Sequence, residues 1–364
     1  MNIVKATRKY EDWLGLHLEI VESDLKLKHE RMAESQFEFF RATFYRWLQQ
    51  WEKVCADLHT TPRLLSVGDL HVENFGTWRD ADGRLVWGVN DFDEASLYPY
   101  TMDLVRLATS ALLAIQEERL KMKPTDTADA ILAGYERAME QGGQAFVLEE
   151  EHGWLRAIAE NKLRDPVVFW KKMDALPTVR GTVPESAREA VEHLLPEQAM
   201  RYRLAHRVAG LGSLGRVRLV AIADWRGGRI AREAKALAPS ALHWADPATP
   251  REILYGAILR RAVRCPDPFV QLRGHWIVRR LSPHCSRIEL DALATARSER
   301  RLLEAMGRET ANIHAGTEGK RNAILKDLHR RKASWLVKAA QDMAEKVAED
   351  WQDWREHQQG QAAS

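Results

Sequence analysis

The stretch SVGDLHVENFGTWRDADGRLVWGVNDFDEASLYPYTMD, residues 66–103, decides how this chain folds. It begins at the end of an apolar run, residues 64–67, and contains a second apolar run at residues 85–89. Both runs are predicted to be short strands, and the turn-forming residues 80–83 between them predict a hairpin-like connection. The polar side chains that follow the two strands should therefore emerge at one edge. They are Asp69 and Asn74 after the first strand, and Asp91 and Asp93 after the second.

An aspartate, an asparagine five positions later and a second aspartate after the next strand match the needs of phosphoryl transfer. In this interpretation Asp69 is the base for the attacking hydroxyl, while Asn74 and Asp91 hold magnesium against the phosphates. Asp93 would assist metal binding or orient the loop. The alternative is that these residues only form turns, which Asp and Asn favour in any protein. Acidic residues beside apolar neighbours are costly unless paired or metal-bound, and this favours the functional interpretation.

Two further residues are predicted to support this loop. His71 is grouped with Asp69 as a catalytic candidate, and its expected contribution is a hydrogen bond that stabilises the loop, with metal ligation as the alternative. Asp103 lies in the first turn of a helix that begins near residue 99, from which it could brace the loop from behind.

These motifs support a family resemblance. GDLH with Asn74, NDFDEA at residues 90–95 and MDLVRLA at residues 102–108 resemble the catalytic segment of the aminoglycoside and choline phosphotransferases. The chain more closely resembles an uncharacterised bacterial family, domain of unknown function 2252, in the protein-kinase-like superfamily. The resemblance covers most of residues 30–345. At residues 31–42, RMAESQFEFFRA, this chain departs from the family pattern, with Gln36 and Ala42 in place of Pro and Gly.

A glycine cluster marks a second candidate site. Gly210, Gly212 and Gly215, with Ser213 between them, are followed by an alternating segment rich in β-branched residues. A dinucleotide-binding fold would need a helix here, so the pattern favours a strand, a glycine loop and a second strand. Such a loop covers the phosphates of a nucleotide with its backbone amides. The alternative is a flexible hairpin turn.

Lys235 follows a further hairpin at residues 226–228 and is predicted to hold the α- and β-phosphates of ATP. Arg232 competes for this role, because one sequence does not fix the strand register. A helix predicted over residues 250–263 offers Glu252 as the ion-pair partner of the lysine, although the family resemblance places that glutamate nearer Gly256.

The order of these elements indicates a rearranged fold. From residue 200 the pattern is strand, glycine loop, strand, strand, helix, strand, strand, which resembles the small lobe of a kinase-like protein. Residues 282–284 would then be the hinge. Because the candidate catalytic segment precedes this lobe, the chain is predicted to be a circularly permuted, two-lobed, kinase-like α+β protein. The expected parts are residues 1–199 (N-terminal helices and catalytic part of the large lobe), 200–282 (nucleotide-binding lobe) and 283–364 (helices that complete the large lobe).

Composition narrows the choice of partners. The 364 residues are 45% hydrophobic and 29% charged, with a formal net charge of +2, which gives no reason to expect a nucleic acid partner. No apolar run approaches the length of a membrane span, and the first residues do not resemble a signal peptide. The three cysteines form no close-spaced pair, which suggests a reducing compartment. A cytoplasmic location is therefore expected.

The sequence as a whole predicts an ATP- and Mg-dependent phosphotransferase that acts on a small-molecule hydroxyl. Alternatives on the same scaffold are a nucleotide-binding module without catalysis and nucleotidyl transfer to a protein. A metal-dependent phosphoesterase is disfavoured, because the further His and Asn motifs of a two-metal site are missing. The sequence identifies neither the acceptor nor the oligomeric state.

Overall fold

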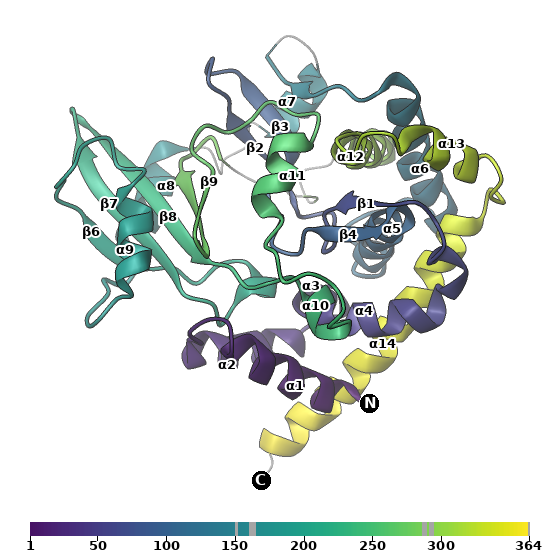
Figure 1. The fold of residues 1–364 in the computed structure, drawn as a ribbon, viewed down its shortest axis with the longest axis horizontal. Helices are drawn as coiled ribbons and strands as arrows, with labels where there is room; N and C mark the ends of the chain where they lie inside the picture. Colours follow the sequence, from purple (N-terminus) through teal and green to yellow (C-terminus); the bar gives the residue numbers. More distant parts are fainter. Residues whose placement is uncertain (150–151, 160–164, 286–289, 291–294, 363–364) are drawn as a thin grey trace.

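The computed structural model describes residues 1–149, 152–159, 165–285, 290 and 295–362. It is a mixed α+β protein with several small sheets, as the sequence predicted (Figure 1). The helices are α1 (Ile3–Gly15), α2 (Glu22–Met32), α3 (Gln36–Ala42), α4 (Phe44–Val54), α5 (Tyr100–Gln116), α6 (Pro124–Gln141), α7 (Gly153–Ala159), α8 (Pro166–Asp174), α9 (Glu185–Glu192), α10 (Ala241–Ala245), α11 (Tyr255–Arg261), α12 (Ala296–Ala315), α13 (Arg321–Leu328) and α14 (Trp335–Ala362). Short 3₁₀ turns occur at η1 (Ala56–Leu58) and η3 (Leu211–Ser213). The strands are β1 (Arg63–Ser66), β2 (Phe75–Arg79), β3 (Leu85–Val89), β4 (Ser96–Pro99), β5 (Phe146–Val147), β6 (Arg203–His206), β7 (Arg218–Trp225), β8 (Gly228–Ala236), β9 (Gln271–Arg273) and β10 (Trp276–Leu281).

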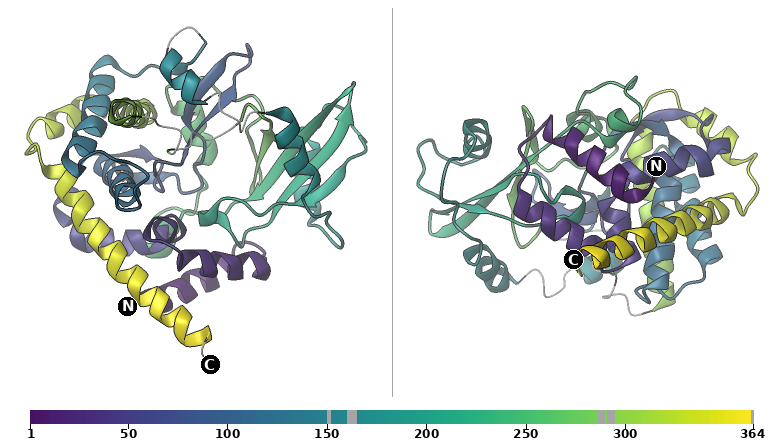
Figure 2. Two further views of the ribbon diagram at one scale, coloured as in Figure 1. Left: turned by 180° about the vertical axis from the view of Figure 1, so that it is seen from behind. Right: turned by 90° about the horizontal axis from the view of Figure 1, so that it is seen from below.

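The helical part is built around α5, whose side chains are buried on nearly all sides. The long helix α14 runs across α4 and α5 and covers them from behind (Figure 2). Helices α6 and α12 approach most closely where Gly134 and Gly307 meet the backbone of the opposite helix. The C-terminal helices α13 and α14 are separate, because the chain leaves helical geometry at residues 329–334. None of the described helices is both long and apolar enough to cross a membrane.

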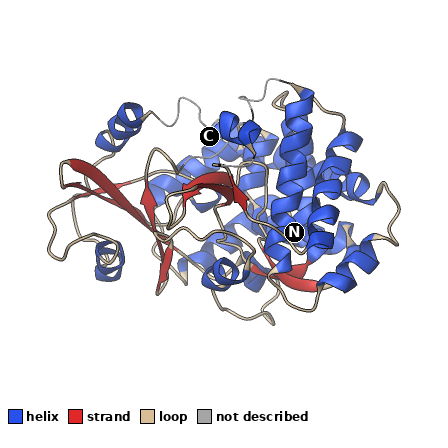
Figure 3. Ribbon diagram, turned by 90° about the horizontal axis from the view of Figure 1, so that it is seen from above, coloured by secondary structure: helices blue, strands red, loops and turns tan. Residues whose placement is uncertain are grey.

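A five-stranded antiparallel sheet projects from the side of the helical part (Figure 3). Its strand order in space is β6-β7-β8-β10-β9. Along the chain, the glycine loop lies between β6 and β7, and α11 lies between β8 and β9, as the sequence predicted. Helix α9 packs its small residues Ala187 and Ala190 against one face of the sheet. The opposite face near the helical part carries charged side chains, among them Glu233 and Lys235.

The predicted hairpin between the first two apolar runs is wrong in its pairing. Both runs are strands, but β1 pairs with β4, and β3 pairs with β2 and β5. The turn at residues 80–83 instead joins β3 to β2, a strand that the sequence analysis missed. Asp80 closes this turn by accepting hydrogen bonds from the backbone N–H groups of Asp82 and Arg84. The loop that follows β1 and the loop that follows β3 still lie side by side, because the N–H of Asn90 donates to the carbonyl of Asn74 (3.0 Å).

The helix predicted over residues 250–263 is also shorter than expected. It begins only at Tyr255, since a turn at Asp246 and Thr249 precedes Pro250 and the chain stays irregular through the next four residues. The Asp246 carboxylate accepts a hydrogen bond from Ala248 N–H, and this fixes the turn.

Candidate functional site

The loop that follows β1 is fixed in place by the buried carboxylate of Asp103. The N–H groups of Val67 and Gly68 donate to its two oxygens at 2.8 and 2.9 Å. Nε2 of His314, on α12, lies 3.1 Å from the same carboxylate, and the other ring nitrogen contacts Tyr135. The predicted brace behind the loop is thereby confirmed. It links the loop to three helices.

Gly68 is required at the start of this loop. Its φ of +83° is unfavourable for residues with a side chain, and a Cβ would lie 2.5 Å from the carbonyl oxygen of Glu94. The glycine therefore allows the loop to pass close to the chain that leaves β3, which brings Asp69 near Asp91 and Asp93.

Asp69 is held by an arginine that the sequence analysis did not single out. Arg106 on α5 donates from Nε and Nη2 to Oδ1 of Asp69 (3.1 and 2.5 Å). The guanidinium is buried against the rings of Phe40 and Trp47, at 3.6 and 4.7 Å from their centroids. Oδ2 of Asp69 is directed toward Gly212, and a Cβ at that glycine would lie 3.6 Å from it. Burial raises the pKa of Asp69, although Arg106 opposes the shift.

Asp91 and Asp93 follow β3 and share one cation. Nζ of Lys235 lies 3.3 Å from Asp91 and 2.6 Å from Asp93. Burial and the Asp91 charge raise the pKa of Asp93, whereas Lys235 holds the pKa of Asp91 below its usual value against the effect of burial. The structure also resolves the register: Arg232 lies on the opposite face of β8 and donates to the carbonyl of Leu194, so Lys235 is the residue that reaches the acids.

The glycine loop closes over these acids. Gly210 and Gly215 both have positive φ, and the turn between them carries the exposed Gly212. A Cβ at Gly212 would lie 3.0 Å from the carbonyl oxygen of Arg41. Val21, the residue before α2, holds the base of the loop, since its N–H donates to the Gly215 carbonyl at 2.8 Å.

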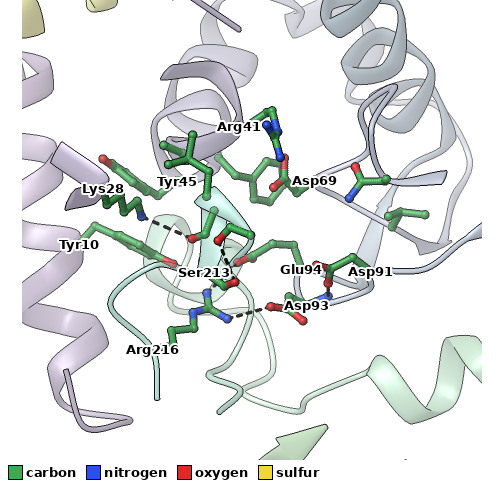
Figure 4. A pocket seen from close by; sticks show the side chains of 17 residues that line it. Tyr10, Lys28, Arg41, Tyr45, Asp69, Asp91, Asp93, Glu94, Ser213 and Arg216 are labelled. Atoms are coloured by element: carbon green, nitrogen blue, oxygen red, sulfur yellow. Dashed lines mark hydrogen bonds and ion pairs between the residues drawn. The ribbon is translucent and has the colours of Figure 1, made fainter. Parts of the chain in front are cut away.

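These segments enclose one small pocket (Figure 4). Its volume accessible to water is about 70 Å³, and Asp69, Asp91, Asp93 and Asn74 line it together with Gly210, Gly212 and Ser213. Lys235 lies behind Asp91 and Asp93. The candidate base, the candidate metal ligands and the glycine loop are thus brought together from two distant parts of the chain.

Two of the remaining candidates make contacts inside the loop itself. His71 is buried, and its Nδ1 accepts a hydrogen bond from Glu73 N–H at 3.2 Å. The side-chain oxygen of Asn74 accepts one from His71 N–H at 2.7 Å. Ser213, from the glycine loop, accepts from Arg218 at 2.7 Å.

The prediction for Glu252 is wrong. This residue is exposed and precedes α11, because the helix starts three residues later than Glu252. The ion-pair partners found for Lys235 among the described residues are Asp91 and Asp93. Gly256, the other position considered, carries no side chain.

Several charged residues of the pocket were not predicted from the sequence. Arg216 contacts Asp93 and Glu94 at 3.3 and 3.4 Å. Burial raises the pKa of Glu94 to about 7, although Arg216 opposes the shift. Lys28, from α2, also lines the pocket. The position of Arg216, directly after the last glycine of the loop, could have identified it from the sequence. No sequence feature identifies Lys28, because only the tertiary structure brings α2 to the pocket.

The donor set suits a hard divalent cation such as magnesium. Asp91 and Asp93 offer carboxylate oxygens, and Asn74 offers an amide oxygen, all lining one pocket. The side chain of Asp91 is 35% exposed, so it has open space on one side.

Comparison with known proteins gives one match. A family model described as an uncharacterized protein conserved in bacteria, domain of unknown function 2252, matches residues 20–165. This range contains Asp69, Asn74, Asp91 and Asp93, and it ends before the five-stranded sheet. Neither the curated proteins nor the solved structures gave a match to the chain.

Proposed function

We propose that this protein is an ATP- and magnesium-dependent phosphotransferase that acts on the hydroxyl group of a small molecule. One observation carries the proposal: Asp69, Asp91 and Asp93 line the same pocket as Gly212, and Lys235 pairs with Asp91 across 144 positions of the chain. Acids, a lysine and a glycine loop in this arrangement supply the main contacts that phosphoryl transfer requires.

The proposal includes a kinase-like fold with a permuted order of elements. Residues 200–282 would be the nucleotide-binding lobe, and the residues before and after them would form the catalytic lobe. The strand order β6-β7-β8-β10-β9, with the glycine loop between β6 and β7, supports this division. So does the position of α12 and α14, which come from the C-terminal part yet pack against α5 and α6 of the N-terminal part.

Each residue has a defined task in the proposed reaction. Asp69 would accept the proton of the acceptor hydroxyl through Oδ2, while Arg106 keeps Oδ1 in place; the raised pKa of Asp69 makes it a better base. Asp91, Asp93 and Asn74 would hold magnesium, which when bound supplies charge neutralisation on the phosphoryl group. Once Asp91 and Asp93 bind the metal, Lys235 would be available to contact the phosphates.

The glycine loop must move for a nucleotide to enter, because Gly212 lies against Asp69 and Arg41 and the pocket is too small for a triphosphate. We expect Mg·ATP to stabilise the wild-type protein, by about 2.7 kcal/mol at a hundredfold excess over the dissociation constant. Gly212→Val should abolish this gain, because its methyl groups obstruct the phosphates. The apo variant should also lose some stability, because a Cβ at this position lies 3.0 Å from the backbone carbonyl of Arg41, so the nucleotide shift is taken relative to each variant's own apo melting temperature.

Differential scanning fluorimetry with and without Mg·ATP measures both quantities. Gly360→Val is the control, since nothing lies within 4 Å of a Cβ at that position. An equal nucleotide shift in wild type and Gly212→Val contradicts the assignment of the glycine loop.

The metal assignment makes a separate prediction. Asp91→Asn should weaken Mg·ATP binding by about tenfold or more, because a charged oxygen ligand becomes neutral. Folding should be little affected, since Asp93 remains 2.6 Å from Lys235. Titration calorimetry at several magnesium concentrations tests this, with the exposed Asp224→Asn as the control. Nucleotide binding that ignores both magnesium and Asp91→Asn would favour a module without catalysis.

That module is the second candidate, and the closed glycine loop against Asp69 is the observation that favours it. A screen of metabolite mixtures for ATP consumption separates the two. Formation of ADP supports phosphoryl transfer, and release of pyrophosphate supports nucleotidyl transfer. ATP binding without consumption in any mixture supports the non-catalytic module.

A further inference from the structure

Lys28 is a buried cation without a matching anion. The residue is only 3% exposed, and no carboxylate in the described part of the chain lies within ion-pair distance of it. Its Nζ makes one long hydrogen bond, 3.4 Å to the carbonyl of Gly212, and lies 6.0 Å from the ring of Tyr45. Burial lowers the pKa of Lys28 to about 8. Buried charges are ordinarily paired, so this lysine lacks a partner that a ligand would supply.

The acids of the same pocket already have cations of their own. Asp69 pairs with Arg106, Asp91 and Asp93 pair with Lys235, and Glu94 contacts Arg216. None of these acids neutralises Lys28, which approaches from α2 on the opposite side of the glycine loop (Figure 4).

Two arginines of the pocket also have unused donors. In the described part of the structure, Nε of Arg41 and Nε of Arg216 are buried without a hydrogen-bond acceptor. Nη1 of Arg41 contacts Glu38 and Glu73, whereas Nη1 and Nη2 of Arg216 contact Asp93 and Glu94. Lys28, Arg41 and Arg216 all line this pocket, and Arg41 lies next to Asp69 in Figure 4.

The size and lining of the space restrict the ligand. About 70 Å³ accommodates a small oxyanion or a few water molecules, and the hydroxyl groups of Tyr10, Tyr45 and Ser213 belong to residues of the same lining. We infer that this pocket binds an anionic oxygen group, phosphate or carboxylate, that the acceptor molecule carries in addition to its reacting hydroxyl, with Lys28 as its principal partner. The acceptor class is thus an anionic alcohol such as a sugar phosphate or a hydroxy acid. This step rests on the proposed function.

Inorganic phosphate and acetate are the probes for this site. In scanning fluorimetry at pH 7, one or both should raise the melting temperature of the wild-type protein by about 2 °C or more at 10 mM. Lys28→Met should lose this shift, and Lys26→Met, on the exposed side of the same helix, should keep it. Phosphate alone identifies a phosphate-bearing acceptor, and acetate alone identifies a carboxylate. Lys28→Met should itself fold at least as well as the wild type, because a methionine replaces an unpaired buried cation.

Repeating the phosphate titration with saturating magnesium and a non-hydrolysable ATP analogue separates acceptor from donor. An additional phosphate shift on top of the nucleotide shift supports the acceptor site. Loss of the phosphate shift once the analogue is bound would place the anion at the transferred phosphoryl group and overturn the acceptor assignment.

Two other results overturn the inference in different ways. An equal anion shift in Lys28→Met and wild type removes Lys28 from any anion site. A changed nucleotide response in Lys28→Met with no anion shift in any variant would leave Lys28 only the task of holding the glycine loop. Absence of any Mg·nucleotide shift is a failure of the proposed function, and the phosphate comparison without nucleotide still decides whether the anion site exists.

Discussion

Asp69→Asn is expected to reduce the rate of ATP-dependent phosphorylation by about 10²–10⁴-fold, the usual contribution of a general base. The amide can still accept from Arg106, so the loop keeps its position, but it cannot take the proton of the acceptor hydroxyl. Mg·ATP binding should be retained, because Asp91, Asp93 and Lys235 are untouched. The rate is measured as ADP formation in the metabolite mixture that supports turnover by the wild-type protein.

The stability of this variant must be measured alongside its rate. The buried Arg106 loses its counter-charge in Asp69→Asn, which costs up to about 3–5 kcal/mol in comparable buried pairs. A variant that binds Mg·ATP normally and is inactive identifies Asp69 as the base. A variant that binds Mg·ATP and keeps the wild-type rate excludes Asp69 from this role.

Gly307→Ala is expected to destabilise the protein by about 2 kcal/mol or more, although alanine is the better helix former. A Cβ at Gly307 on α12 would overlap the carbonyl oxygen of Ile131 on α6, and one at Gly134 would overlap the carbonyl oxygen of Glu304 in return. The obstructing atoms are backbone, so the helices themselves would have to separate. Because α12 carries His314, which contacts Asp103, a shift of α12 should also displace the loop that carries Asp69.

Urea unfolding at equilibrium measures this effect, with Gly360→Ala as the control. Gly360 lies in α14 and has open space around it, so alanine there should be neutral or stabilise by up to about 1 kcal/mol. A Gly307→Ala protein as stable as the Gly360→Ala protein would contradict the close contact between α6 and α12.

Local patterns were reliable wherever one short segment fixed its own conformation. A hairpin was predicted at residues 226–228, and the structure forms it with residues 226–227 as a two-residue loop, both with the positive φ that such a tight turn requires. The alternation around the glycine cluster correctly predicted β6, the loop and β7. The pattern failed at residues 250–254, where the turn at Asp246 competes with the helix.

The pairing of strands was not predictable from the same patterns. Runs of four or five apolar residues can pair with any edge of suitable length, and the connection through residues 80–83 pointed to the wrong partner for β1. The choice of β4 as the partner of β1 depends on residues 96–99, which come after the acidic segment and have little pattern of their own.

Residue type and spacing alone identified Asp69, Asn74, Asp91, Asp93, Gly212 and Lys235 as candidates, because acids beside strands and glycines between strands are informative within a short window. Their convergence on one pocket, the partnership of Lys235 with two aspartates, and the Arg106 support of Asp69 were decided only by the tertiary structure. The same holds for Lys28, whose helix contributes a cation across 184 positions of the chain from Gly212. Long-range contacts depend on how whole elements pack. The local sequence around a single charged residue on a helix does not show which surface that helix will contact.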